Sequence, residues 1–165
     1  MKQIPLNTKT FKGHYTLVDD EDYEWLSQWR WSTTSNGYVR RAGLKCEGSF
    51  WRRHIRMHRQ IMGVMSVKTH VDHINHNPLD NRRCNLRVCT AAQNQANEKL
   101  SVNSVSGYKG VCWHRVAGKW RATIHVNKKS IHLGLFVNKT DAVCAYNKAA
   151  KKHFGVFALL NEVKE

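Results

Sequence analysis

Hydrophobic residues recur with two different periods along the chain, and each period predicts a different kind of element. From residue 119 to 126, apolar side chains take every second position, which predicts a strand with one buried face. Shorter apolar runs predict strands over 110–114 and 130–135. In residues 140–153 the apolar positions have the three- and four-residue spacing of a helix, and Gly155 follows as a C-terminal stop. The last third of the chain therefore predicts three strands and one helix.

The beginning of the chain predicts a strand followed by a helix. Residues 15–18 form the expected strand, and Asp19 stands at the N-cap position of the helix. The first turn of this helix holds Asp20, Glu21 and Asp22, where acidic side chains suit the helix dipole. A metal site is the alternative interpretation of these acids, and a capped surface helix is the favoured one.

A hairpin and a second helical segment are predicted next. Asn36-Gly37 is typical of a two-residue turn, and it joins predicted strands at 29–32 and 38–41. Residues 55–65 predict a strand that runs into a short helix. Four arginines and two histidines in residues 51–59 suit contact with phosphates, with a solvated basic surface as the alternative.

A strand, loop, strand and helix are predicted between residues 71 and 97. The strands fall at 71–75 and 86–89, with a polar turn between them. Thr90 followed by Gln93 has the form of a capping box at the start of the helix. This short unit contains an acid next to a histidine and an asparagine on the helix, which are side chains able to hold a hard metal ion and activate water.

The predicted elements give an α+β fold in two domains. Residues 99–106 are rich in Ser and Asn and lack a clear period, so they are expected to form a linker. The first domain is then 1–98, and the second, smaller domain is 107–165.

Charge and composition indicate the partner. The 165 residues carry a formal net charge of +15, spread over both halves of the chain, which favours a polyanion such as nucleic acid. No apolar run is long enough for a membrane span, and the N-terminus lacks a signal-peptide pattern, so a cytoplasmic protein is expected. Of the five cysteines, only Cys84 and Cys89 lie close together, so structural zinc is not expected.

The segment 71–97 resembles the ββα-metal motif of HNH endonucleases, in the HNN form found in phage homing endonucleases. The resemblance is carried by Asp72-His73, by Asn85-Leu86-Arg87 and by Asn94. It implies that Asp72 and Asn94 bind one divalent ion, Mg²⁺ or Mn²⁺. It also implies that His73 is the general base and that Asn85 accepts a hydrogen bond from its far ring nitrogen. His76 stands where many family members have Gly, and we expect it to be a spectator.

Residues 106–161 resemble the AP2 DNA-binding domain, a three-stranded antiparallel sheet with one helix. The matching stretches begin with Gly107-Tyr108-Lys109-Gly110-Val111 and end with Leu160-Asn161. The resemblance and the strand alternation together predict an outward, DNA-facing set: Lys109, His114, Arg121, Thr123, His125, Lys128, Lys129 and His132. In the first domain, the candidates for DNA contact are Arg40, Arg41, Arg52 and Arg53. Tyr146 matches a helix tyrosine that contacts the backbone of DNA, with core packing as its alternative.

Together these features predict a site-specific, metal-dependent DNA endonuclease of the homing type from a phage or bacterial setting, acting on double-stranded DNA. A monomer is favoured. One alternative is a non-catalytic DNA-binding protein on a degenerate nuclease scaffold, and the presence of all four motif residues argues against it. A second is an RNA-binding protein, for which no RRM or KH signature is present.

Overall fold

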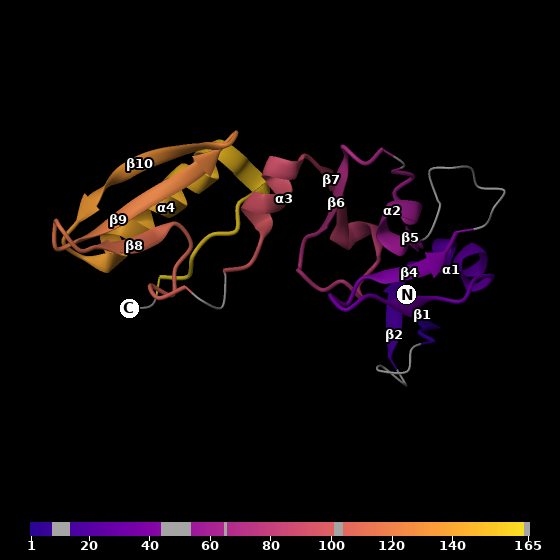
Figure 1. Ribbon diagram of the computed structural model, residues 1–165. Helices are drawn as coiled ribbons and strands as arrows, with labels where there is room; N and C mark the ends of the chain where they lie inside the picture. The colour runs from indigo at the N-terminus through magenta and orange to yellow at the C-terminus, as the bar shows by residue number, and fades with distance from the viewer. Residues whose placement is uncertain (8–13, 44–53, 65, 101–103, 164–165) are drawn as a thin grey trace. The chain divides into compact units, whose positions relative to one another are not determined.

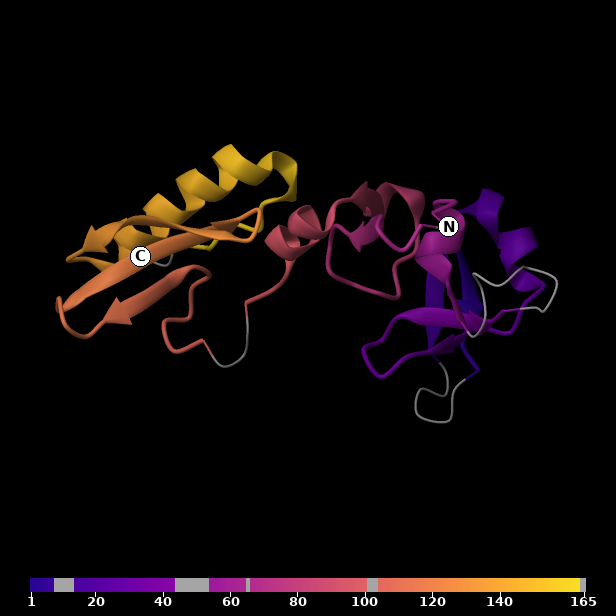
Figure 2. The same cartoon turned by 45° about the horizontal axis from the view of Figure 1, so that its top comes forward.

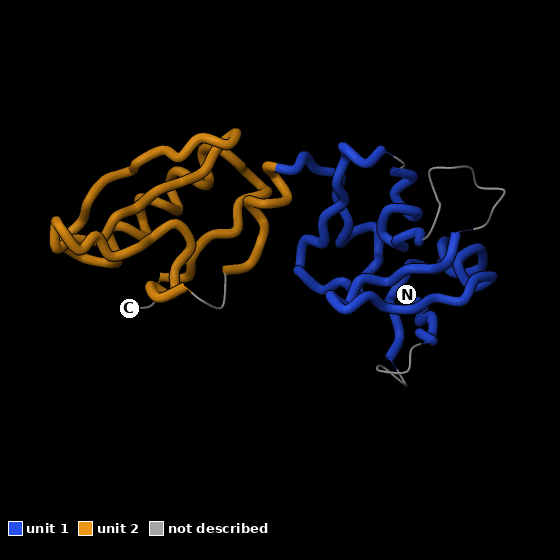
Figure 3. The backbone as a smooth tube through the Cα atoms, viewed as in Figure 1, with its two compact units in different colours: residues 1–91 blue, residues 92–165 orange. Residues whose placement is uncertain are grey.

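The computed structural model describes residues 1–7, 14–43, 54–64, 66–100 and 104–163, and these form two compact units. The first unit comprises residues 1–91 and the second residues 92–165 (Figure 3). The boundary between the units falls at the start of the helix that follows residue 90, earlier than the predicted end of the first domain at residue 98.

In its described residues, the first unit comprises three small antiparallel sheets, two short α-helices and one 3₁₀ helix (Figure 1). Its elements, in chain order, are β1 (Lys2–Pro5), β2 (Tyr15–Val18), α1 (Asp20–Ser27), β3 (Ser32–Thr33), β4 (Val39–Ala42), β5 (His54–Arg56), α2 (Met57–Ile61), β6 (His70–His73), the 3₁₀ helix η3 (Arg83–Asn85) and β7 (Leu86–Cys89). The sheets pair β1 with β2, β3 with β4 and β5, and β6 with β7.

One apolar core joins these sheets. Leu26 of α1, Trp31, Val39 of β4 and Met57 of α2 are almost completely buried in it, and Leu86 of β7 lies in the same cluster. A hairpin is present at the predicted place, because β3 and β4 are antiparallel and Gly37 takes the left-handed φ of 80°. The predicted two-residue turn is wrong, because Thr33 pairs with Val39 and the loop between them is longer. Strand β1 was not predicted from the sequence.

The second unit is a three-stranded antiparallel sheet with one long helix. Its elements are α3 (Ala91–Asn97), whose first residue belongs to the first unit, then β8 (Val111–His114), β9 (Lys119–Val126), β10 (Lys129–Phe136), α4 (Lys139–Phe154) and the 3₁₀ helix η4 (Gly155–Phe157). Strand β9 lies between β8 and β10. Figure 2 shows α4 lying along one face of this sheet. The three predicted strands and the predicted helix are all present, and β9 has the predicted bounds.

The buried side of this sheet is lined by small and branched residues that let α4 approach closely. Ala122 and Ile124 of β9 pack against Ala142 and Tyr146 of α4. A Cβ on Gly110, which has a φ of 72°, would lie 2.1 Å from the Tyr146 ring, so only glycine fits there. Burial raises the pKa of Tyr146 to about 12, and this position in the core agrees with the packing alternative for Tyr146.

Candidate functional site

The hairpin of β6 and β7 positions the acid-histidine pair. His73 is the last residue of β6, and the turn after it is closed by hydrogen bonds from the His76 N–H to the His73 carbonyl and from the Ile74 N–H to the Asn85 carbonyl. Asp72 and His73 are both buried. Because adjacent residues in a strand face opposite ways, the two side chains have different partners.

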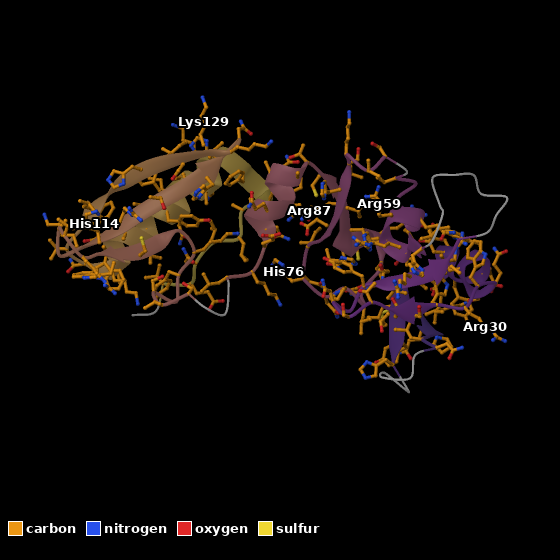
Figure 4. The ribbon with its side chains drawn as sticks, viewed as in Figure 1. Arg30, Arg59, His76, Arg87, His114 and Lys129 are labelled. Carbon is orange, nitrogen blue, oxygen red and sulfur yellow. The ribbon has the colours of Figure 1, made fainter. Side chains whose placement is uncertain are left out.

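Asp72 is held by an arginine on the neighbouring strand. The register places Asp72 opposite Arg87, and the Arg87 guanidinium donates to Asp72 Oδ2 from Nε at 3.1 Å and from Nη2 at 2.8 Å. Figure 4 labels Arg87 on β7. Both side chains are largely buried, at 15% and 11% exposure, so the pair fixes the orientation of the carboxylate.

The donor chemistry of Asp72 fits a hard divalent ion, since a carboxylate oxygen is the ligand type that Mg²⁺ and Mn²⁺ favour. Arg87 engages Oδ2 and thereby orients the whole carboxylate. Asn94, the other expected ligand, lies half-buried on α3 in the second unit, so its role stays a prediction. In the described part of the chain, no three His, Cys, Asp or Glu side chains gather into a metal cluster; one carboxylate and one amide would not form such a cluster.

The imidazole of His73 forms a hydrogen bond with Asn81, a residue of the loop between β6 and β7. Its Nε2 lies 3.3 Å from Asn81 Oδ1, and Asn81 is fully buried. The Asn81 amide nitrogen donates to the Pro78 carbonyl at 3.1 Å, and a carbonyl can only accept, so the atom facing His73 must be the amide oxygen. Asn81 therefore requires the proton on His73 Nε2. In the neutral ring, the lone pair then lies on Nδ1, the nitrogen that can act as a base.

Burial keeps the His73 ring neutral. It lowers the pKa of His73, and this effect outweighs the opposing influence of the Asn81 hydrogen bond and of the Asp72 and Asp80 charges. Two further rings pack against it: the ring centroid of His58 lies 5.0 Å away and that of Tyr38 lies 5.8 Å away. His58 is itself 2% exposed, and burial lowers its pKa to about 2. A neutral, confined imidazole is suited to proton abstraction.

Asn85 is not the residue that orients His73, contrary to the expectation from the resemblance. Its Oδ1 accepts from the Asn75 N–H at 3.0 Å, and its Nδ2 donates to the Asp80 carbonyl at 2.8 Å. Asn85 thus ties together the two ends of the loop between β6 and β7. The residue that sequence reasoning missed is Asn81, because four asparagines in residues 75–85 offer no pattern that singles it out.

Arginine–carboxylate pairs hold the same loop. Arg82 donates to Asp80 from Nε at 2.7 Å and from Nη2 at 2.6 Å, and the hydrogen bond from Arg82 is the main reason that the pKa of Asp80 lies below its usual value. Arg83 donates in the same way to Asp22 of α1, at 2.8 and 2.7 Å. The Arg83 backbone N–H donates to Asp19 Oδ2. Asp19 does occupy the N-cap position of α1, but its side chain makes no capping bond there and contacts the loop instead.

The predicted DNA contacts of the first unit have different positions. Arg41 is 3% exposed, donates to Gln60 Oε1 and stacks over Trp29 at 4.2 Å, so it is a buried structural residue and not a surface contact. Arg40 is half-buried on β4. Arg52 and Arg53 lie outside the described residues.

With one exception, the residues predicted to contact DNA in the second unit lie on the three-stranded sheet or at its turn, and the contact itself stays a prediction. Arg121, His125, Lys128, Lys129 and His132 are exposed, while Thr123 and His114 are half-buried. Asn127 and Lys128 both have positive φ and make the tight turn, so Lys129 starts β10. Figure 4 shows the labelled Lys129 projecting from the sheet and His114 near the turn after β8.

The exception is Lys109. Its Nζ donates to the carbonyls of Gln95, Ala96 and Glu98, at 3.1, 2.7 and 2.8 Å. Burial lowers the pKa of Lys109. These carbonyls lie at the C-terminal end of α3, where a cation is favoured by the helix dipole. Lys109 therefore anchors α3 within the second unit, and its ammonium group is not placed on the outer face.

Residues 52–96 match the family model described as HNH endonuclease. The chain thus carries an HNH endonuclease domain and is a nuclease. It is 27% identical over 158 residues to a protein named as an uncharacterized HNH endonuclease of Acanthamoeba polyphaga mimivirus, covering 92% of this chain and 77% of that protein. It is 33% identical over 78 residues to Protein 3.8 of Escherichia phage T7, covering 47% of this chain and 64% of that protein.

No solved structure matches the chain. The matched family segment ends at residue 96, so the likeness of the second unit to an AP2 domain rests on the sequence stretches and the strand–helix order given above. In the described part of the chain, no helix combines the length and the apolar character that a bilayer crossing requires.

Proposed function

We propose that this nuclease is a site-specific, metal-dependent DNA endonuclease of the homing type. The observation that carries the proposal is the state of His73: a buried neutral imidazole at the end of β6, with Nε2 committed to Asn81 and the lone pair on Nδ1. That arrangement equips a histidine to take a proton from an attacking water. The family match supplies the reaction class.

The proposed reaction is hydrolysis of one phosphodiester bond. His73 Nδ1 takes a proton from water, the water oxygen attacks phosphorus, and the bond to the 3′ oxygen breaks. The products carry a 5′ phosphate and, once the leaving oxygen is protonated by solvent, a 3′ hydroxyl. Asp72 and Asn94 would hold one Mg²⁺ or Mn²⁺, which supplies Lewis-acid stabilisation of the charge on the phosphate and the leaving oxygen.

The proposed division of labour gives DNA binding to the second unit. Arg121, His125 and His132 lie on the exposed side of the β8–β9–β10 sheet, and Lys128 and Lys129 lie at the turn that joins β9 to β10. A narrow sheet of this kind fits the major groove, and a basic side chain at its edge reaches phosphates. The high net charge of +15 supports a polyanionic substrate.

A plasmid-nicking assay tests the proposal. Supercoiled DNA that carries candidate target sites is incubated with the full chain and Mg²⁺ or Mn²⁺, with EDTA, or with the His73→Ala variant. We expect nicking that needs the metal and falls by at least about 100-fold in the variant, since general-base catalysis typically contributes that much. Tight binding of DNA without cleavage under any metal would instead favour a non-catalytic DNA-binding protein on a nuclease scaffold.

A further inference from the structure

A threonine in the N-terminal strand lies at the end of a buried hydrogen-bond chain that reaches His73. Thr16 of β2 is 0% exposed, and its Oγ1 accepts from Asn81 Nδ2 at 2.8 Å. The same hydroxyl donates to the Leu79 carbonyl at 2.8 Å. The hydroxyl has one proton, and its two acceptors are the Leu79 carbonyl and, more distant at 3.9 Å, Met57 Sδ. Whichever of these takes the proton, the Thr16 oxygen has only a lone pair to offer Asn81. Asn81 must then donate to Thr16, and its oxygen must face His73.

The backbone holds this chain in register. The Leu17 N–H donates to the Leu79 carbonyl at 2.8 Å, and the Asn81 N–H donates to the Leu17 carbonyl at 2.9 Å. These two bonds make a parallel bridge between Leu17 and Asp80. Strand β2 thus runs beside the loop of the nuclease motif, although Thr16 lies outside the residues that match the family.

We propose that Thr16 and Asn81 are positioning residues that set the tautomer of the catalytic histidine; this inference rests on the function proposed above. Thr16 holds the Asn81 amide nitrogen away from His73. An Asn81 amide turned by half a rotation would present its N–H₂ group to Nε2, and Nε2 would have to accept. The ring proton would then lie on Nδ1, and the nitrogen that must take the proton from water would already carry one.

The Thr16→Val variant tests this inference in the full chain. Valine has nearly the same shape but lacks the hydroxyl, so the Asn81 amide nitrogen keeps only the Pro78 carbonyl. We expect the single-turnover cleavage rate to fall on the order of 10-fold with DNA affinity unchanged, as for other groups that orient a catalytic side chain. Thr16→Ser, which keeps the hydroxyl, should restore the rate.

Nitrogen NMR of the histidine rings gives a readout independent of cleavage. The His73 signals are identified by their absence from the spectrum of His73→Ala. In the unaltered chain and in Thr16→Ser, they should show the proton on Nε2, and in Thr16→Val they should shift toward a mixture of tautomers. Val18→Ala is the matched control, since it weakens the same buried strand without touching the hydrogen-bond chain. It should lower the melting temperature and leave the tautomer and the rate per folded molecule unchanged.

The outcomes separate the inference from the function it rests on. An unchanged His73 tautomer and rate in Thr16→Val, with His73→Ala inactive, would overturn the role of Thr16 alone. Equal losses of rate in Thr16→Val and Val18→Ala would also overturn it, because strand stability would then explain both. Full cleavage by His73→Ala would defeat the proposed function, while the NMR comparison would still decide whether Thr16 sets the tautomer.

Discussion

His76 stands where many related motifs have glycine, and its backbone angle gives the reason for that preference. Its φ is 59°, in the left-handed region that favours glycine, and its N–H closes the turn after β6 by donating to the His73 carbonyl. The need for this angle explains why glycine suits the position in related motifs. The angle gives His76 a structural place in the turn, while its expected role as a spectator stays a prediction.

The buried His58 predicts an acid-sensitive fold. Its pKa is about 2 in the folded chain and about 6.5 when exposed, so below pH 6.5 the unfolded chain binds a proton that the folded chain does not. The free energy of unfolding should therefore fall as the pH drops from 6.5 toward 2. The slope should approach about 1.4 kcal/mol per pH unit from this residue. The lowered pKa of His73 acts in the same direction.

Urea denaturation at pH 7.5, 6.5, 5.5 and 5.0 measures this slope. His58→Gln removes the titrating ring and is the comparison. We expect the variant to be less stable at pH 7.5 because it lacks a packed ring, yet to lose less stability on acidification than the unaltered chain. Parallel pH profiles for the two proteins would contradict the assignment.

At the scale of elements, helix α1 and strand β2 support the loop that carries the site. Asp22 of α1 is 1% exposed, and it accepts hydrogen bonds from Arg83 and from the Trp25 indole. Glu21 of the same turn lies 2.9 Å from Arg83. Of the three acids for which a metal site was the alternative, Glu21 and Asp22 are thus partners of Arg83, and this fixes the helix to η3. Asp20 instead accepts a hydrogen bond from the N-terminal amine of Met1.

Removing the Asp22 carboxylate should destabilise the first unit. Asp22→Ala leaves the Arg83 guanidinium with Glu21 in place of two carboxylate partners and leaves the Trp25 N–H without its acceptor, which should lower the free energy of unfolding by roughly 1 to 3 kcal/mol. Glu24→Gln is the control, because Glu24 pairs with Lys2 at 3.7 Å on the surface with 85% of its side chain exposed. That change should stay within about 0.5 kcal/mol. Thermal or urea unfolding of both variants measures the difference, and equal effects would argue against the assigned role of Asp22.

Most helices and strands could be predicted from local sequence patterns. The long-range contacts that hold the site in place could not. Alternation in residues 119–126 specifies β9 because every second side chain meets α4. The bond between Thr16 and Asn81 joins residues 65 positions apart, and no local period encodes such a contact. The same limit explains why β1 was missed and why Arg41, basic in sequence, is buried in the structure. The motif residues Asp72 and His73 were found because they are adjacent within a recognisable segment.

At the scale of the whole molecule, the net charge of +15 is distributed over surfaces with different roles. In the second unit, the exposed Lys128 and Lys129 lie at the turn joining β9 and β10, while Lys151 and Lys152 lie on α4 (Figure 2). Total charge alone would give these two pairs equal weight in binding DNA. In the proposed interface, Lys128 and Lys129 contribute to DNA affinity and the pair on α4 does not.

Salt dependence of DNA binding distinguishes the two pairs. In Lys128→Gln/Lys129→Gln, the slope of log K against log salt should become shallower by about 0.9 for each phosphate that is no longer neutralised, and affinity should fall on all sequences. Lys151→Gln/Lys152→Gln removes the same charge from α4 and should leave the slope almost unchanged. Binding titrations between about 50 and 200 mM salt, the range in which phosphate neutralisation has a strong effect on affinity, measure both. Equal slopes for the two variants would indicate nonspecific attraction instead of the assigned face.

The contact between β2 and the loop at residues 78–83 also decides which part of the chain could work as a nuclease module in a fusion protein. A fusion that borrows only residues 52–96 would carry Asp72, His73 and Asn85, but it would lack Thr16 and the carboxylate of Asp22. Such a fusion would keep the motif residues and lose the residues that hold the loop beside His73 in place. The smallest portable cutting module should therefore start before residue 14, upstream of everything that the family signature records.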